Sequence, residues 1–182
     1  MFERNIIITG KHASYIKFLS EKTKFLGDNA SKNGAGVFER NIDVFMIAPL
    51  IGLTYNRKAN ADISIDEKSN IFAEQLIKEK LNLQFIYNIV NIVDTSRNLS
   101  PDKKIDILFK NDGDMDLFMN YVRGGIEYLY EHFSERASTK TDYYEKIIEL
   151  VNAIQLERND NYEEQLKKLN WHRNKNIVVK CN

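Results

Sequence analysis

The sequence predicts a mainly α-helical single domain of five to seven helices, with a small two-stranded ribbon joining the termini as an added element. Apolar residues recur at helical spacing over most of the 182 residues. Only two short runs of β-branched residues have the character of strands. We therefore expect one helical domain over residues 1–165 and a basic C-terminal tail over residues 166–182, which packs on that domain or extends from it.

The first third of the chain predicts a strand followed by two helices. Ile6–Ile8 is a β-branched run that indicates a strand, and residues 14–26 place apolar side chains at helical spacing. Residues 27–36 are rich in Gly, Asn and Ser, which predicts a loop. Residues 37–56 are the most apolar stretch and predict a mostly buried helix. Because Pro49 lacks an amide hydrogen, we expect that helix to kink or break one turn earlier.

The middle of the chain predicts a connector and two or three further helices. Residues 57–68 are polar and indicate the connector. Residues 69–95 have helical spacing and form either one long helix or two, with Lys78–Lys80 as the expected joint. Ser100 followed by Pro101 predicts a helix start, because serine caps the first turn and proline suits the first helical position.

The last third predicts a glycine-interrupted helix and one or two more. Residues 114–134 carry an apolar stripe, broken by Gly124-Gly125. Each glycine costs roughly 1 kcal/mol relative to alanine inside a helix, so the pair indicates either close approach of another backbone or a bend. A helix is expected over residues 141–158 and a short one over 162–169. Residues 177–179 form the second β-branched run, which we expect to pair with the N-terminal strand.

Composition excludes several classes of protein. One cysteine excludes a disulfide scaffold and a multi-cysteine zinc site. No apolar run is long enough to cross a bilayer, and the N-terminal residues do not resemble a signal peptide, so we expect a cytoplasmic protein. The glycines of residues 27–36 lack the Gly-Lys-Ser/Thr ending of a nucleotide-binding loop. We therefore expect no cofactor and no enzymatic activity.

The charge is balanced overall but unevenly distributed. The chain has 26 Lys or Arg and 26 Asp or Glu, yet residues 166–182 contain five cations and no acid. Cations interleaved with an aromatic residue can neutralise phosphates and stack on a base, whereas the alternative is a solvated tail docked by its tryptophan. The candidate nucleic-acid-binding residues are Arg57, Lys58, Lys167, Lys168, Trp171, Arg173 and Lys175.

Three alternating carboxylates supply the one candidate for metal chemistry. Asp112, Asp114 and Asp116 have the spacing by which oxygen ligands converge on a hard cation. The glycine comes too early for a calcium loop, and the bidentate acid near the twelfth position is missing. Acids in the first turn of a helix are also stabilising without a bound metal ion. We therefore predict no metal site. A divalent-metal hydrolase that uses these three carboxylates stays as the third hypothesis.

Residues 37–52 resemble a pattern found in small helical proteins of bacterial DNA-modification and phage-defence clusters, of which the DNA phosphorothioation protein DndE is the nearest family. The matching positions are Phe38, Arg40, Asp43, Phe45, Ala48 and Gly52. Pro49 departs from the pattern, and the chain is longer than that family. The resemblance implies an accessory, DNA-associated protein without catalysis of its own.

Three functional hypotheses follow. The first is a non-enzymatic accessory subunit of a bacterial anti-phage defence or DNA-processing complex, which contacts nucleic-acid backbone and a larger partner such as an ATPase or nuclease. The second is a pure assembly subunit without DNA contact, able to oligomerise, whose apolar helices face that larger subunit. The third is the hydrolase. Loss of DNA binding with salt distinguishes the first hypothesis from the second.

Overall fold

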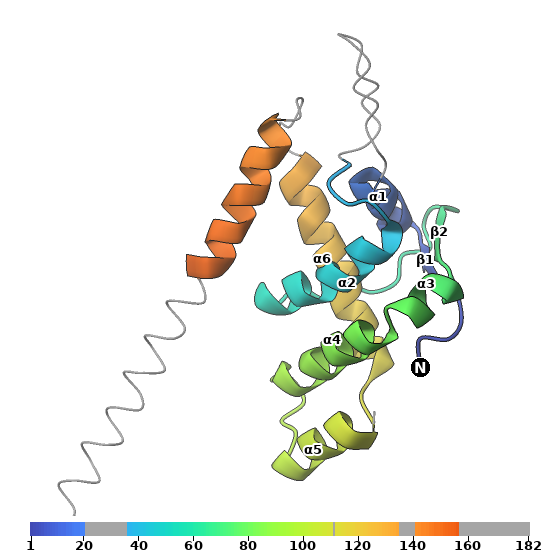
Figure 1. Ribbon diagram of the computed structural model, residues 1–182, viewed down its shortest axis with the longest axis vertical. Helices are drawn as coiled ribbons and strands as arrows, with labels where there is room; N and C mark the ends of the chain where they lie inside the picture. The colour runs from blue at the N-terminus through green and yellow to red at the C-terminus, as the bar shows by residue number, and fades with distance from the viewer. Residues whose placement is uncertain (21–35, 111, 135–140, 157–182) are drawn as a thin grey trace, which may run out of the picture. The chain divides into compact units, whose positions relative to one another are not determined.

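The computed structural model describes residues 1–20, 36–110, 112–134 and 141–156, and it confirms the predicted fold class. Within those ranges the chain forms seven helices and one two-stranded antiparallel sheet (Figure 1). The chain divides into two compact units, Met1–Thr139 and Lys140–Asn182. The described part of the second unit is one helix, residues 141–156. None of the described helices combines the length and the apolarity that a membrane span requires.

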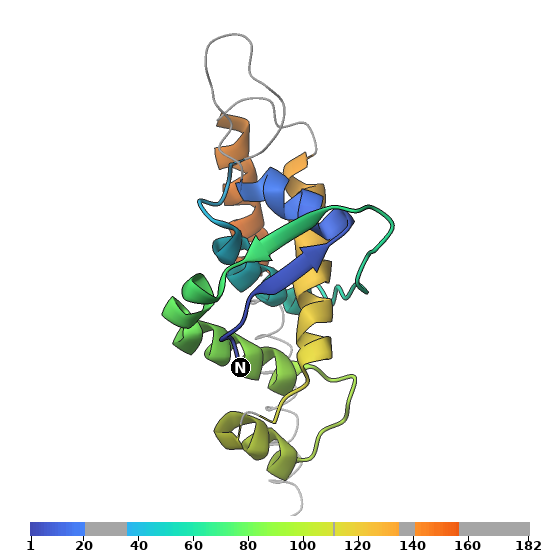
Figure 2. The same cartoon turned by 90° about the vertical axis from the view of Figure 1, so that its right-hand side faces the viewer.

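The first unit holds the sheet and the other six described helices. In chain order its elements are β1 (Ile6–Thr9), α1 (Lys11–Ser20), α2 (Asn41–Thr54), β2 (Lys68–Ile71), α3 (Ala73–Lys78), α4 (Lys80–Val93), α5 (Pro101–Lys110) and α6 (Met115–Ser134). Figure 2 shows β1 and β2 side by side in front of α6. The first unit thus packs a short sheet and helices around one core.

The sheet confirms β1 and corrects the sequence analysis at β2. Ile6 pairs with Ile71 and Thr9 pairs with Lys68 in an antiparallel register. These partners lie where we expected the end of a connector and the start of a helix, so that prediction was wrong. Lys68–Ile71 has only one apolar residue, and its strand character comes from pairing with β1 rather than from its own composition. The other predicted strand, residues 177–179, lies outside the described residues.

Helix boundaries follow the local signals at two places and depart from them at one. The helical stretch after β2 is split into α3 and α4 at Glu79, inside the predicted joint. Ser100 precedes α5, whose first residue is Pro101, as expected. Of the predicted kink or break near Phe45, the break was wrong, because α2 continues through Pro49 from Asn41 to Thr54 and Pro49 is buried, while the kink stays a prediction. Burial of this apolar helix outweighs the hydrogen bond that proline removes.

An aromatic cluster forms the centre of the core. Phe118 of α6 meets three other rings edge-on, those of Phe2, Phe45 and Tyr87, at centroid distances of 6.0, 6.0 and 5.5 Å. Each ring comes from a different segment: the residues before β1, α2 and α4. Edge-to-face pairs at this distance add to the stabilisation from burial itself. The cluster therefore ties α6 to the N-terminal segment and to two helices.

The glycine pair of α6 is a packing contact. A Cβ atom at Gly125 would lie 1.8 Å from the Ala48 carbonyl oxygen, and one at Gly124 would lie 2.1 Å from the Arg57 carbonyl oxygen. On the α2 side, a Cβ at Gly52 would lie 2.3 Å from the Tyr121 carbonyl oxygen. Each distance is too short for any side chain, so α2 and α6 meet backbone to backbone. We call this contact the α2–α6 seam.

Candidate functional site

Arg57 and Lys58 are the two predicted phosphate-binding residues that the structure describes, and they directly follow α2. The Arg57 amide donates to the Gly52 carbonyl at 2.7 Å, and the Asn56 amide donates to the Leu53 carbonyl at 3.2 Å. Asn56 has a φ of +48°, so this is a Schellman motif with asparagine in the left-handed position. The motif ends α2 and turns the next residues back along α6, beside the seam.

Both cations are held by carboxylates of the chain itself. One guanidinium nitrogen of Arg57 donates to both oxygens of Glu131, at 2.7 and 2.8 Å. The ammonium of Lys58 donates to Asp94 at 2.8 Å. An approaching phosphate must compete with these carboxylates for the two cations. Contact of Arg57 and Lys58 with nucleic acid stays a prediction.

Asp94 is the centre of a buried polar cluster, which we call the Asp94 node. Its side chain is 2% exposed and accepts hydrogen bonds from the Tyr121 hydroxyl at 2.7 Å and the Ser96 hydroxyl at 2.6 Å, besides that of Lys58. The Lys58 ammonium also lies 4.8 Å from the centroid of the Tyr121 ring. The node therefore links the segment after α2, the C-terminus of α4 and the middle of α6.

The node keeps its groups in their ordinary charge states. Burial acts to raise the pKa of Asp94, but hydrogen bonds from Lys58, Ser96 and Tyr121 outweigh it and lower this pKa to about 2. Burial acts to lower the pKa of Lys58, which its hydrogen bonds to Asp94 and Tyr121 raise instead. Burial and the bond to Asp94 raise the pKa of Tyr121. Because none of these pKa values is moved toward neutrality, the node positions helices and is poorly suited to general acid–base chemistry.

A second polar cluster joins α1 to α6. Glu127 accepts from the Nε2 atom of the buried His12 ring and from the Lys11 ammonium, each at 2.9 Å. Burial lowers the pKa of His12 despite the carboxylate, so the ring is neutral at pH 7. The Lys11 amide, at the start of α1, donates to Asp62 at 2.7 Å, and this bond lowers the pKa of Asp62 to about 2. The chain's own carboxylate thus occupies the anion position of this helix N-terminus.

The three alternating carboxylates do not converge. Asp114 caps α6 by accepting from the Leu117 amide at 2.9 Å, and an Asp112 oxygen lies 3.9 Å from the Lys103 ammonium. Within the described ranges, no three His, Cys, Asp or Glu side chains are placed to hold a metal ion. Capping and surface pairing account for Asp112 and Asp114, and Asp116 stands in the first turn of α6.

The remaining predicted nucleic-acid-binding residues belong to the C-terminal stretch. They lie outside the described residues, and their contact with nucleic acid stays a prediction: Lys167, Lys168, Trp171, Arg173 and Lys175.

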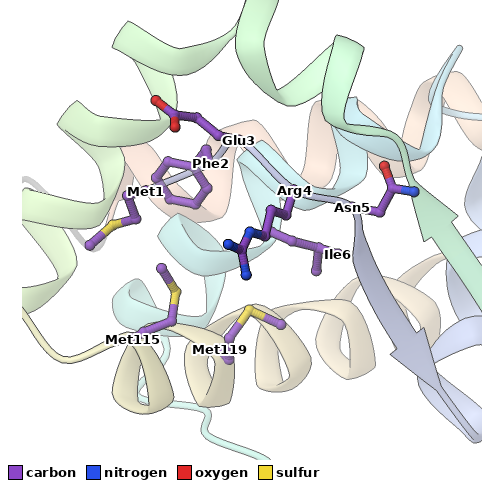
Figure 3. A pocket seen from close by; sticks show the side chains of 8 residues that line it. All are labelled: Met1, Phe2, Glu3, Arg4, Asn5, Ile6, Met115 and Met119. Carbon is purple, nitrogen blue, oxygen red and sulfur yellow. The ribbon is translucent and has the colours of Figure 1, made fainter.

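A pocket of about 510 Å³ lies between the N-terminal segment and the start of α6. Met115 and Met119 line one side and residues 1–6 line the other. Figure 3 shows the Arg4 side chain extending toward the two methionines, while Glu3 points away from them. Glu3 pairs with Lys80 at 2.6 Å, whereas Arg4 makes no ion pair within the described ranges. The pocket therefore combines adaptable apolar side chains with the Arg4 cation, which has no ion pair within the described ranges.

A row of apolar side chains is exposed along α3 and α4. Its members recur every four residues, and we call the row the apolar ladder: Ile77, Leu81, Phe85, Ile89 and Val93. Leu81 and Phe85 are 86% and 66% exposed, Ile77 and Val93 are about half exposed, and Ile89 is partly exposed. The opposite face of α4 supplies Leu83, Ile86, Tyr87 and Val90 to the core. This helix therefore has two apolar faces and uses only one of them inside the first unit.

Sequence reasoning missed both the pocket and the ladder. The pocket depends on the N-terminal segment lying beside α6, and no local pattern encodes that placement. The ladder has a readable signal, because the i, i+4 repeat from Ile77 to Val93 runs beside a second stripe, from Leu83 to Val90. An isolated helix that is apolar on both faces has more apolar surface than one core contact can cover.

The comparison with protein-family models finds one match that covers most of the chain. A family described as DNA sulphur modification system-associated protein 4 matches residues 16–169. This range includes residues 37–52, on which the resemblance to a DNA phosphorothioation family depends. Searches of curated proteins and of solved structures give no match.

Proposed function

The chain belongs to the family of DNA sulphur modification system-associated protein 4, and from this premise we propose that it is a non-enzymatic accessory subunit that binds a larger protein of such a system. Membership of the family supports an accessory role in DNA modification or defence. The choice of a protein partner, rather than DNA, for the described surface is our proposal. In this proposal the partner protein binds at the pocket beside Arg4.

The observation that carries the proposal is the exposed guanidinium of Arg4, which has no ion pair within the described ranges and lines a pocket beside Met115 and Met119. Arg57 and Lys58 are each neutralised by a carboxylate of the same chain. Arg4 has no such partner within the described ranges and extends over Met115 and Met119 (Figure 3). Charge and shape complementarity therefore favour a partner segment with an apolar side chain next to a carboxylate.

The Asp94 node supports the non-enzymatic part of the proposal. A catalytic acid or base works best with a pKa near the operating pH. The pKa of Asp94 is lowered to about 2, and those of Lys58 and Tyr121 are raised, so the Asp94 node lacks a group of that kind. Each of these groups also has a structural role that explains its burial.

The test is co-expression of the full chain with the other proteins of its DNA sulphur modification system, followed by affinity capture. We expect Arg4→Glu and Met119→Asp each to reduce capture of one such protein by at least about tenfold, because each removes one half of the complementarity. Lys104→Glu is the matched control, since Lys104 is also a cation without an ion pair within the described ranges. Capture that survives both pocket variants would exclude the pocket as the contact.

A second candidate function is contact with nucleic-acid backbone by the C-terminal stretch. The observation that favours it is the five cations and no acid within residues 166–182. In fluorescence anisotropy with duplex DNA, five phosphate contacts would give a slope of log K against log salt of about −4.5. Replacing Lys167, Lys168, Arg173 and Lys175 by Gln should flatten that slope, whereas Arg57→Ala should not. If the full chain does not bind duplex DNA at about 50 mM salt, this second function is excluded and the protein-binding proposal is the one that remains.

A further inference from the structure

The α4 part of the apolar ladder, from Leu81 to Val93, lies on a helix that carries almost no charge. Lys80 is the one charged residue among the 14 residues of α4, and it pairs with Glu3 at 2.6 Å. Side chains next to the ladder are amides that bond locally: Asn82 donates to Glu79 at 3.0 Å, and Gln84 donates to Asn88 at 3.1 Å. Exposed charges flank the α3 end of the ladder, where Glu74 and Lys78 pair with each other at 2.9 Å, so a partner selected by charge would find little on the α4 face to pair with. A second neutral face would meet no repulsion.

The spacing of the ladder is symmetric about its central residue. Within α4, Phe85 has Leu81 and Ile89 at four residues on either side, while Val93 and Ile77 follow at eight, the latter on α3 beyond the break at Glu79. Two identical ladders laid antiparallel across a two-fold axis would place Phe85 against its own copy and Leu81 against Ile89. This is the self-complementarity that a two-fold symmetric interface requires, because the same patch must match itself.

The apolar area that two ladders would bury against each other is the size expected for a weak dimer. Covering one such side chain removes on the order of 100 Å² of apolar surface from water. Five partly exposed side chains on each protomer would then bury on the order of 1,000 Å² in total, at the lower end for specific interfaces. Exposed apolar surface of this kind is typical of an interaction site.

From the neutral face, the symmetric spacing and the area, we propose that the apolar ladder binds a second copy of this chain, with the two α4 helices antiparallel about a two-fold axis beside Phe85. The dimer is independent of the pocket at Arg4, which lies between the N-terminal segment and α6. Each protomer therefore keeps its partner-binding pocket, and the dimer presents two of them.

The first test is the mass of the full chain in solution by light scattering or sedimentation, over protein concentrations from about 1 to about 200 µM. We expect the mass to rise from the monomer value of 21.3 kDa toward twice that value. Leu81→Lys and Phe85→Lys should each hold the mass at the monomer value. Phe109→Lys is the matched control, since Phe109 is 80% exposed on α5 but lies outside the ladder.

The second test examines the symmetry directly by disulfide crosslinking in a Cys181→Ser background. Phe85→Cys should give a crosslinked dimer under mild oxidation, because each position 85 faces its own copy. Leu81→Cys alone should crosslink much less, and a mixture of Leu81→Cys with Ile89→Cys chains should crosslink efficiently. Neither experiment depends on capture of another protein, so its failure is distinct from failure of the proposed function.

Two results would overturn the proposal. One is a wild-type chain that stays at the monomer mass at every concentration, which would assign the ladder to a different protein or to another segment of the same chain. The other is a dimer whose mass is unchanged by Leu81→Lys and Phe85→Lys, which would place the interface elsewhere. Circular dichroism of each variant confirms that a loss of mass is not a loss of fold.

Discussion

The α2–α6 seam and the apolar ladder use helix surface in opposite ways. At the seam the two backbones touch, and a Cβ at Gly125 would lie 1.8 Å from the Ala48 carbonyl. On the ladder, large side chains extend outward, with Leu81 86% exposed. Both regions satisfy the helical period, so periodicity alone does not say which face is internal. Small residues at the crossing mark the contact within the chain, and large residues on a second face mark surface left for another molecule.

The largest expected effect on stability comes from a substitution that disrupts the α2–α6 seam. Gly125→Ala inserts a methyl group where the Ala48 carbonyl lies, and neither helix backbone can move away without disturbing the core. We expect a loss of about 3 kcal/mol in the free energy of unfolding, measured by urea denaturation. Ser134→Ala, at the exposed end of the same helix, is the control and should stay within about 0.5 kcal/mol of wild type. If Gly125→Ala unfolded with the same free energy as wild type, the backbones of α2 and α6 would have to lie farther apart than they do in the structure.

A smaller effect tests the Asp94 node, which braces the seam from one side. The pKa of Asp94 is about 2 when folded and 3.8 as its ordinary value. Its carboxylate therefore adds about 2 kcal/mol of stability at pH values above 4, and this is lost as the pH falls toward 2. We expect Asp94→Asn to lower stability at pH 7 and to flatten the acid limb of stability against pH. Asp66→Asn, at an exposed carboxylate, is the control and should stay within about 0.5 kcal/mol of wild type at pH 7.

The smallest expected effect concerns the exposed pair beside the same node. Arg57 and Glu131 are 42% and 55% exposed, and solvent screens pairs of this kind. A double-mutant cycle of Arg57→Ala and Glu131→Ala should give a coupling energy below about 1 kcal/mol. A coupling several times larger would show that Arg57 is committed to the fold and is unsuited to bind a phosphate.

Local sequence signals were enough for most of the helices. Ser100 and Pro101 mark the start of α5, and Glu79 divides α3 from α4. Gly124-Gly125 indicated either a close approach or a bend, and only the structure shows the close approach of α2. Local signals failed where distant segments decide the outcome. β2 contains one apolar residue and depends on pairing with β1, and burial keeps α2 continuous through Pro49.

The candidate site was less accessible to sequence reasoning. The positions of Arg57 and Lys58 could be picked out as basic residues after an apolar helix. Their carboxylate partners could not, because Glu131 and Asp94 are 74 and 36 residues away. Arg4 had no local feature that separated it from other surface cations. It is distinguished from other cations without an ion pair, such as Lys104, by its place in the lining of the pocket.

The most direct test of the contrast between seam and ladder is urea unfolding of wild type, Gly125→Ala and Leu81→Lys side by side, at a protein concentration of about 1 µM, where a weak dimer is dissociated. We predict that Leu81→Lys unfolds within about 0.5 kcal/mol of wild type, because its side chain is exposed, while Gly125→Ala is strongly destabilised. If Leu81→Lys were as destabilising as Gly125→Ala, the ladder would be packed within its own chain and would not be a surface for another molecule.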